Sequence, residues 1–211
     1  MTRLAIVGAG DLGRLIAHHV AAAGDTVVGF FDDVAPAGTP VDGSVVLGPT
    51  ASVESAFAAG RFDALLPAIG YRHFGVRRAL FERLSAAVPF AVFVHRSAYV
   101  DASAELGPGT VVLPGCVLDR NVRIGRGVLL NTAVTIAHDS SVGDHSFLSP
   151  RVAVAGFVAI GECCNIGINT TVIDNVSIGD GVQTGGGAVV TRDLATPGLY
   201  VGVPAVLKRA F

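Results

Sequence analysis

A branched aliphatic residue recurs at every sixth position through the second half of the chain. Fourteen consecutive hexads carry it without a break: Val100, Leu106, Val112, Leu118, Ile124, Leu130, Ile136, Val142, Leu148, Val154, Ile160, Ile166, Val172 and Ile178. A period of six matches neither the 3.6 residues of an α-helix nor the two of a simple strand. Such a short, fixed period indicates stacked copies of one unit that is too small to bury its own apolar face.

When the repeated aliphatic residue is counted as the first position of each hexad, the other positions are restricted as well. The fifth position always holds a small or β-branched residue, and the second position is often glycine. Short strands favour β-branched residues, and the intervening Gly, Asp and Asn residues suit tight corners. We expect the second-position glycines to provide backbone angles that other residues resist. The pattern therefore predicts an all-β, parallel β-helix over residues 97–211, with coils stacked about 4.8 Å apart.

Residues 1–96 show a different pattern, in which buried-strand runs alternate with helical stretches. The expected strands cover residues 4–7, 26–31, 45–47, 64–69 and 90–94, and the expected helices cover 14–23, 50–58 and 76–87. This alternation predicts a small α/β domain with a parallel, Rossmann-like sheet.

A glycine fingerprint, Gly8-x-Gly10-x-x-Gly13, follows the first expected strand and opens the first helix. In this context, glycines allow a phosphate to approach backbone N–H groups, and the helix N-terminus favours its charge. Asp32 and Asp33 follow about twenty residues later, where an acid commonly contacts a ribose hydroxyl. The motif alone would suit NAD or NADP, but the domain is too short for two nucleotide-binding halves, so one nucleotide fits better. Glycines that merely turn the chain are the structural alternative.

Composition and charge narrow the class of protein. The net charge is −2, which gives no indication of a nucleic-acid partner. Only 15% of residues are charged, so we expect a large buried interface. No apolar run is long enough for a membrane span, and the N-terminus has no signal-peptide layout. The three cysteines have no Cys-x-x-Cys spacing and are interpreted as reduced packing residues of a cytoplasmic protein.

Further motifs extend over essentially the whole chain. They are Phe31-Asp32-Asp33, Ala68-Ile69-Gly70, Asn131-Thr132, Ile136-Ala137-His138-Asp139, Gly167-Ile168-Asn169, Gly185-Gly186-Gly187 and Val201-Gly202-Val203-Pro204-Ala205. With these motifs, the chain resembles the bacterial sugar acyltransferases of the PglD, PerB and NeuD type, which belong to the hexapeptide-repeat superfamily. The resemblance implies a left-handed β-helix with three hexads in each triangular coil, although general chirality rules favour right-handed crossovers.

The resemblance also implies an activity and its partners. In the closest members, acetyl-CoA acetylates the amino group of a nucleotide-linked 4-amino-4,6-dideoxy sugar, and the N-terminal domain holds the nucleotide. Their β-helices form a homotrimer, and acetyl-CoA lies in a cleft between neighbouring helices. We therefore expect an acetyl-CoA-dependent N-acetyltransferase that requires no metal.

Acyl transfer from a thioester to a neutral sugar amine needs one general base and a donor for the oxyanion, without a covalent enzyme intermediate. His138 is the candidate base, because the third hexad position lies at a polar corner rather than in the core. The resemblance aligns His138 with the catalytic histidine of the family and Asp139 with its acidic partner. Adjacent residues of a straight strand face opposite ways, so this pairing requires a corner.

Gly156 follows His138 by eighteen residues, which is one coil of three hexads, so we expect it to lie directly over the histidine. The resemblance implies that the Gly156 N–H contacts the acetyl oxygen and that Asn131 assists in positioning. It also implies coenzyme A contacts at Ile168, Gly186, Val203 and Pro204. Gly70 and Tyr71 lie in the loop after the third long strand, where they would meet the nucleotide.

One departure from the family leaves the acceptor atom open. Some members carry a second histidine nine residues after the first, but Phe147 stands there, and His145 lies two residues earlier. We expect His145 to be a surface histidine, and O-acetylation of a sialic-acid-type sugar remains an alternative. A zinc protein like γ-carbonic anhydrase would need three histidines where the repeats supply two. A non-enzymatic nucleotide-binding module is the last alternative.

Overall fold

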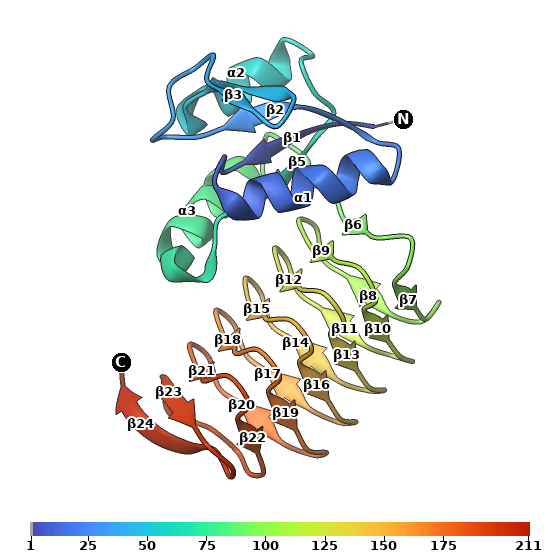
Figure 1. The fold of residues 1–211 in the computed structure, drawn as a ribbon, viewed down its shortest axis with the longest axis vertical. Helices are drawn as coiled ribbons and strands as arrows, with labels where there is room; N and C mark the ends of the chain where they lie inside the picture. The colour runs from blue at the N-terminus through green and yellow to red at the C-terminus, as the bar shows by residue number, and fades with distance from the viewer. Residues whose placement is uncertain (1) are drawn as a thin grey trace. The chain divides into compact units, whose positions relative to one another are not determined.

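A computed structural model describes residues 2–211, and the chain divides into two compact units between Phe93 and Val94. Each unit is coloured by position along the chain in Figure 1.

The first unit is built on a five-stranded sheet. Its strands are β1 (Arg3–Val7), β2 (Thr26–Phe31), β3 (Pro40–Val41), β4 (Ser44–Gly48) and β5 (Ala64–Pro67), in the order β3-β4-β2-β1-β5. Neighbouring strands are parallel except for the antiparallel pair β3 and β4. The connecting helices are α1 (Asp11–Ala22), α2 (Val53–Ala58) and α3 (Phe74–Leu84), with 3₁₀ turns η1 (Thr50–Ser52) and η2 (Tyr71–His73).

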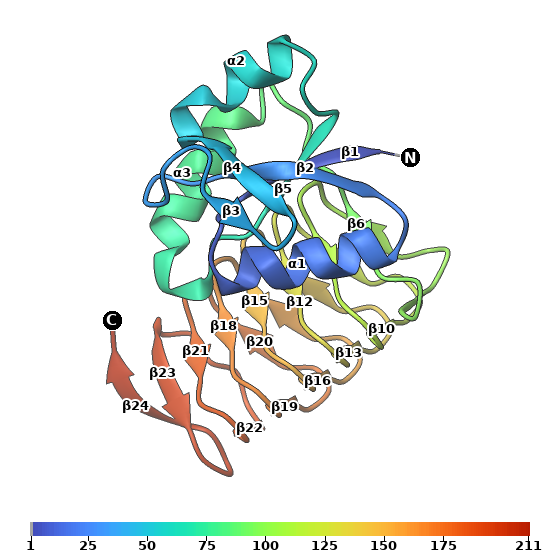
Figure 2. The ribbon, with the colours of Figure 1, turned by 45° about the horizontal axis from the view of Figure 1, so that its top comes forward.

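Helices cover both faces of this sheet. Successive side chains of a strand point to opposite faces, and the strands carry apolar side chains on both, so each face needs a covering layer. Phe31 of β2 is buried in a cluster with Val53 of α2 and Leu80 of α3. Its neighbour Phe30 faces the other way and lines a cavity together with Ala17 of α1. Figure 2 shows α1 on one side of the sheet and α2 and α3 on the other.

The first unit differs from the sequence-based expectation in several element bounds: β5 ends at Pro67 rather than residue 69, and α3 spans Phe74–Leu84 rather than 76–87. Three further differences have a structural reason. Helix α1 begins at Asp11 rather than residue 14, because the Gly10 carbonyl accepts a hydrogen bond from the Arg14 N–H (3.0 Å). The hairpin of β3 and β4, which turns at an Asp-Gly pair, was not expected; both turn residues have positive φ, as this tight turn type requires. The expected strand 90–94 is reduced to a bridge between Leu65 and Phe90, followed by the short strand β6.

The second unit is a parallel β-helix whose two-residue strands recur every six residues. They are β6 (Phe93–Val94), β7 (Tyr99–Val100), β8 (Glu105–Leu106), β9 (Val111–Val112), β10 (Val117–Leu118), β11 (Arg123–Ile124), β12 (Leu129–Leu130), β13 (Thr135–Ile136), β14 (Ser141–Val142), β15 (Phe147–Leu148), β16 (Ala153–Val154), β17 (Ala159–Ile160), β18 (Asn165–Ile166), β19 (Thr171–Val172), β20 (Ser177–Ile178), β21 (Gln183–Thr184) and β22 (Val189–Val190). Strands that are three apart in the series pair with each other, from β6 with β9 to β19 with β22, as Leu118 pairs with Ile136, so one coil has eighteen residues. Three sheets of six, five and eight strands result, and an antiparallel hairpin of β23 (Gly198–Val201) and β24 (Val206–Ala210) ends the largest.

The repeated apolar residues fill the interior of the β-helix, as the hexad pattern predicts. First-position side chains from Val112 to Ile178 are at most 4% exposed, and the fifth-position side chains between them are equally buried. Buried hydroxyl groups at the fifth position bond to the next coil. The Ser140 hydroxyl, for example, donates to the Ala155 carbonyl (2.9 Å) and accepts the Val158 N–H (3.1 Å). The stack continues past Ile178 through the buried residues Thr184 and Val190.

The backbone corners differ from the expectation for the glycines. In every hexad from Gly109 to Gly187, the fourth-position residue has a φ between 53° and 75°, so the left-handed corner lies there. A Cβ on the second-position Gly107 would lie 2.6 Å from the carbonyl carbon of Gly125 in the next coil. The second-position glycines therefore allow the coils to stack closely, and the expected role in unusual backbone angles is wrong for them.

Candidate functional site

His138 and Asp139 form a hydrogen-bonded pair at the corner between β13 and β14. Asp139 has a φ of 59°, which turns the two adjacent side chains toward each other. The His138 Nδ1 lies 2.9 Å from the Asp139 Oδ2, and the imidazole is 42% exposed. Because an ionised carboxylate can only accept a hydrogen bond, the neutral imidazole in this geometry has its proton on Nδ1 and its lone pair on Nε2.

Two residues from the preceding coil hold the Asp139 carboxylate. The Asn121 Nδ2 donates to Oδ1 (2.9 Å), and the Arg120 guanidinium lies 3.3 Å from Oδ2. The hydrogen bonds from Asn121 and then His138 hold the pKa of Asp139 below its usual value, so the carboxylate is ionised at neutral pH. Sequence reasoning missed Asn121, although its eighteen-residue separation from Asp139 is the coil length that places Gly156 over His138.

Gly156 lies against the imidazole of His138, as the coil length predicts. A Cβ on Gly156 would lie 2.7 Å from the imidazole Cε1 and 2.9 Å from Nε2. The Gly156 N–H forms no hydrogen bond within residues 2–211, although Gly156 is buried. Since buried N–H groups are almost always paired, this one is available to a bound group.

Phe157 was also not anticipated as a neighbour of the site. Its ring lies 5.1 Å from the imidazole of His138, at an interplanar angle of 85°. The side chain is 57% exposed although it is apolar and sits at a left-handed corner. Asn131 lies at the corner between β12 and β13, where its Oδ1 accepts the Thr132 N–H (2.8 Å).

The residues predicted to contact a coenzyme lie on later coils. Ile168 and Gly186 are neighbours on successive coils, because a Cβ on Gly186 would lie 3.0 Å from the Ile168 Cγ2. Ile168 is 49% exposed, and Val203 is 73% exposed in the loop between β23 and β24, where it precedes a cis Pro204. His145 is only 2% exposed, so the expected surface position of this histidine is wrong.

A cavity of about 370 Å³ opens at the carboxyl ends of β1, β2 and β5. It gathers most of the predicted nucleotide residues: Gly8, Gly10, Asp32, Asp33 and Gly70. Tyr71 follows Gly70 at the start of η2 and is 37% exposed. Gly13 instead serves packing, because a Cβ there would overlap with the Gly8 carbonyl oxygen.

The two acids of this cavity are engaged by the protein itself. The Asp32 carboxylate accepts N–H groups of Ala9 (2.7 Å), Val34 (2.8 Å) and Ala35 (2.9 Å). Asp33 accepts both the N–H (2.7 Å) and the hydroxyl (2.9 Å) of Thr50. One N–H of the glycine loop, which a phosphate was expected to approach, is therefore bonded to Asp32.

Replacing Asp32 by asparagine is expected to lower the thermal unfolding midpoint at pH 7. Partial burial raises the pKa of Asp32, but its three backbone hydrogen bonds outweigh this and bring the pKa below 3.8. A lowered folded-state pKa stabilises the protein above the unfolded-state value, and this stabilisation is lost as the pH falls through the folded-state pKa. Thermal unfolding should therefore separate wild type from variant at pH 7, and the difference should diminish as the pH falls through the pKa of Asp32 in the folded state. Equal midpoints at pH 7 would contradict this structural role.

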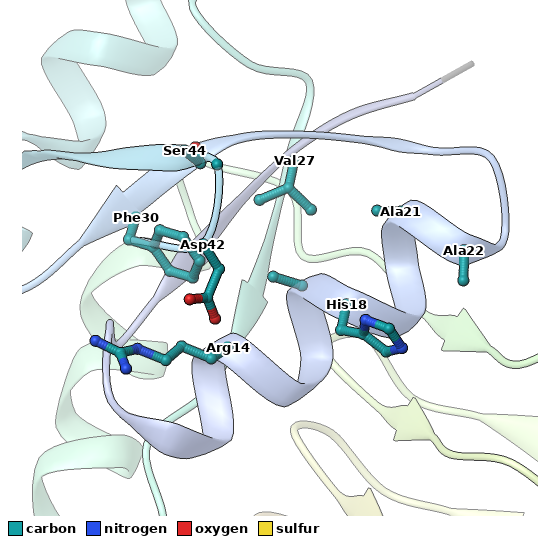
Figure 3. Close-up of a pocket in the computed structure, with 10 residues that line it drawn as sticks. Arg14, His18, Ala21, Ala22, Val27, Phe30, Asp42 and Ser44 are labelled. Atoms are coloured by element: carbon teal, nitrogen blue, oxygen red, sulfur yellow. The ribbon is translucent and has the colours of Figure 1, made fainter. Parts of the chain in front are cut away.

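A larger cavity, of about 540 Å³, lies elsewhere on the first unit. Figure 3 shows Arg14 and His18 of α1 beneath Asp42 of the β3–β4 turn, with Phe30 of β2 behind them. Ligands of open α/β sheets bind at the carboxyl ends of the strands. The smaller cavity, which holds the fingerprint, is therefore the candidate substrate site.

Two other classes of site are absent from the described part of the chain. Within residues 2–211, no group of three or more His, Cys, Asp or Glu side chains is arranged to hold a metal ion. Over the same residues, no helix has both the length and the apolar character to cross a membrane.

Comparison with known proteins identifies relatives of both units. A family model described as the PglD N-terminal domain matches residues 3–84. No curated protein sequence matches the chain.

Three solved structures resemble the chain over almost its whole length. The acetyltransferase domain of PglB from Neisseria gonorrhoeae FA1090 is 31% identical with a TM-score of 0.90, covering 98% of this chain and 100% of that one. It has also been solved with acetyl coenzyme A. PerB from Caulobacter crescentus, in complex with CoA and GDP-perosamine, is 30% identical with a TM-score of 0.91, covering 99% and 98%. WeeI from Acinetobacter baumannii AYE is 25% identical with a TM-score of 0.83, covering 98% and 100%.

These matches confirm the predicted fold class, which is an α/β Rossmann-like unit followed by a left-handed parallel β-helix. They also confirm the predicted acyltransferase class, because the relatives are acetyltransferases solved with CoA or acetyl-CoA. The chain belongs to the PglD/PerB-type family of sugar acetyltransferases.

Proposed function

We propose that the chain transfers the acetyl group of acetyl-CoA to the amino group of a nucleotide-linked 4-amino-4,6-dideoxy sugar. The complex of PerB with CoA and GDP-perosamine supports both substrates. One observation carries the chemistry: the His138 imidazole donates from Nδ1 to Asp139 and presents Nε2 beside Gly156, whose N–H is unused within residues 2–211. A general base and an oxyanion donor are thus adjacent.

In the proposed mechanism, the sugar amine attacks the thioester carbonyl directly. His138 Nε2 accepts the proton of the attacking amine, and the ionised Asp139 stabilises the imidazolium that forms. The Gly156 N–H donates to the oxyanion of the tetrahedral intermediate. When the intermediate collapses, the carbon–sulfur bond breaks, and the imidazolium returns the proton to the coenzyme A thiolate. Asn131 assists in positioning the acetyl group.

We place coenzyme A along Ile168, Gly186, Val203 and Pro204, in a cleft between neighbouring β-helices of a homotrimer. The exposure of Ile168 and Val203 supports this site, because large apolar side chains at a functional surface gain stability when a ligand or neighbouring chain covers them. The low proportion of charged residues, 15%, supports a large interface between copies. We propose a cytoplasmic location, where acetyl-CoA is made and used.

The nucleotide is proposed to bind the first unit in the cavity of Gly8, Gly10, Asp32, Asp33 and Gly70, with Tyr71 at its edge. The Ala9 N–H, which a phosphate would otherwise approach, already donates to Asp32, so a carboxylate lies at that place. The lowered pKa of Asp32 keeps its carboxylate ionised, so it repels a diphosphate, whereas hydroxyl and N–H groups of a nucleoside can donate to it. The nucleoside part therefore suits this cavity better than the diphosphate.

Replacing Gly10 by valine is expected to raise the KM for the sugar nucleotide by about tenfold, a loss of roughly 1.4 kcal/mol of binding. A Cβ at Gly10 meets no atom within 4 Å, and its φ of −75° suits any residue, so the new side chain should enter the cavity without strain. Steady-state kinetics with each substrate varied in turn would measure the effect, and the KM for acetyl-CoA should not change.

Gly8 provides the contrasting variant. Its φ is 108°, and a Cβ added there would lie 2.8 Å from the Ala68 carbonyl oxygen. Gly8→Ala should therefore destabilise the protein, by about 1–3 kcal/mol. Thermal unfolding should distinguish the two variants. An unchanged sugar-nucleotide KM in Gly10→Val would move the substrate away from this cavity.

The proposed reaction is tested by incubating the protein with acetyl-CoA and a panel of UDP-, GDP- and dTDP-linked amino sugars. An amide product, resistant to hydroxylamine, supports N-acetylation. An ester product, cleaved by hydroxylamine, would replace the proposal with sugar O-acetylation.

A further inference from the structure

Asn121 occupies the same corner as Asp139, one coil earlier. Both residues have a φ of 59°, a backbone region that asparagine and aspartate tolerate better than most residues. The Asn121 backbone is held independently of its side chain, because its N–H donates to the Ser103 hydroxyl (2.9 Å). The side-chain amide is therefore free to serve another contact.

That amide reaches across to the neighbouring coil, which the fold itself does not require. The Nδ2 of Asn121 donates to Oδ1 of Asp139 at 2.9 Å. In the same column of corners, Asn175 has a φ of 57°, yet its Nδ2 donates to the adjacent Asp174 (2.8 Å). Of the two asparagines in this column of corners, Asn121 uses its side-chain amide to bond to the next coil, whereas Asn175 uses it within its own coil.

The bond decides which way the Asp139 carboxylate faces. A carboxylate turns readily about its terminal torsion, because that torsion has broad minima. With Oδ1 held by Asn121, Oδ2 faces the His138 Nδ1 at 2.9 Å. Arg120 contributes less to this orientation, because its side chain is 65% exposed and lies 3.3 Å from Oδ2.

We infer that Asn121 is a positioning residue for acetyl transfer, which orients Asp139 so that His138 carries its proton on Nδ1 and presents a basic Nε2. The inference rests on the proposed function, because Asn121 acts through His138. The lowered pKa of Asp139, to which the Asn121 hydrogen bond contributes most, supports it. Asn121 contacts Asp139, Asp139 contacts His138, and His138 lies against Gly156. Three successive coils thus supply Asn121, the His138–Asp139 pair and Gly156, the proposed oxyanion donor.

The test is Asn121→Ala, with Asn175→Ala as the matched control. Alanine is tolerated at these corners, since Ala133 has a φ of 59° in the same β-helix. Asn121→Ala should lower kcat about tenfold, as the loss of one hydrogen bond to a charged group implies, with the acetyl-CoA KM within about twofold. Asn175→Ala, which removes the same amide from a corner without this contact, should retain wild-type kcat.

A spectroscopic readout separates positioning from stability. The imidazole ¹⁵N signals of His138, assigned by their absence in His138→Ala, should show the Nδ1–H tautomer in wild type and a mixture in Asn121→Ala. Asn121→Asp keeps the shape but removes the donor, so it should lose at least as much kcat. Wild-type kcat in Asn121→Ala, or an unchanged tautomer, would overturn the inference.

The same experiment distinguishes this inference from the proposed function. If the wild-type protein acetylates no sugar nucleotide, the proposed function fails and takes the inference with it. If His138→Ala turns over at the wild-type rate, acetyl transfer stands, but the role of His138 as the base fails and the inference fails with it. If His138→Ala is impaired while Asn121→Ala and Asn121→Asp are not, only the positioning role of Asn121 fails.

Discussion

Replacing His138 by alanine is expected to lower kcat by about 10²–10⁴-fold, which is the usual contribution of a general base. The side chain is 42% exposed at a corner, and its hydrogen bond to Asp139 lies outside the apolar interior, so the β-helix should remain folded. The amine would then lose its proton to solvent, without the adjacent acceptor. Coenzyme A release, followed continuously with saturating sugar nucleotide, measures the change.

Two companion measurements make the His138 result specific. His18→Ala removes an exposed histidine from α1 and should keep the wild-type rate. The acetyl-CoA KM of His138→Ala should stay within about threefold, because a base that acts in the transition state contributes little to ground-state binding. Wild-type turnover in His138→Ala, with the fold intact by circular dichroism, would show that solvent or another group takes the proton.

Much of the site could be predicted because the β-helix converts sequence separation into distance. Eighteen residues make one coil, so the separation of His138 and Gly156 places them in contact. The unbroken aliphatic period determines the coil, and the coil determines which residues stack. The same spacing places Asn121 beneath Asp139, but a corner asparagine is common in this β-helix, so its residue type alone did not mark it as a partner.

Other features were not accessible from residue types. Both a left-handed corner and the close stacking of two coils favour glycine, so glycine at the second hexad position does not by itself indicate which of the two applies. The backbone shows that the left-handed corner lies at the fourth hexad position. Phe157 sits at such a corner, where an aromatic residue is unusual, and no periodicity indicates the direction of its ring. The position of Asp32 after a strand suggested a ribose contact, but its oxygens accept three N–H groups of its own loops.

Replacing Gly156 by alanine is expected to lower kcat by about 10²-fold, the cost of misplacing a catalytic group by about an ångström. The new Cβ would lie 2.7 Å from the imidazole Cε1 and 2.9 Å from Nε2, so the ring must move away from Asp139 or from the substrate. The Gly156 N–H is kept in this variant, so the loss reports on the base. Gly75→Ala, where a Cβ meets no atom within 4 Å, is the matched control and should leave kcat unchanged.

The double variant His138→Ala/Gly156→Ala determines whether the glycine acts through the histidine. Once the imidazole is absent, the new methyl group has no ring to displace, so the double variant should be no slower than His138→Ala alone. Two groups that act as one unit give such non-additive losses, whereas independent sites add their free energies. A double variant about 10²-fold slower than His138→Ala would mean that the methyl group obstructs the acetyl group or distorts the N–H donor directly.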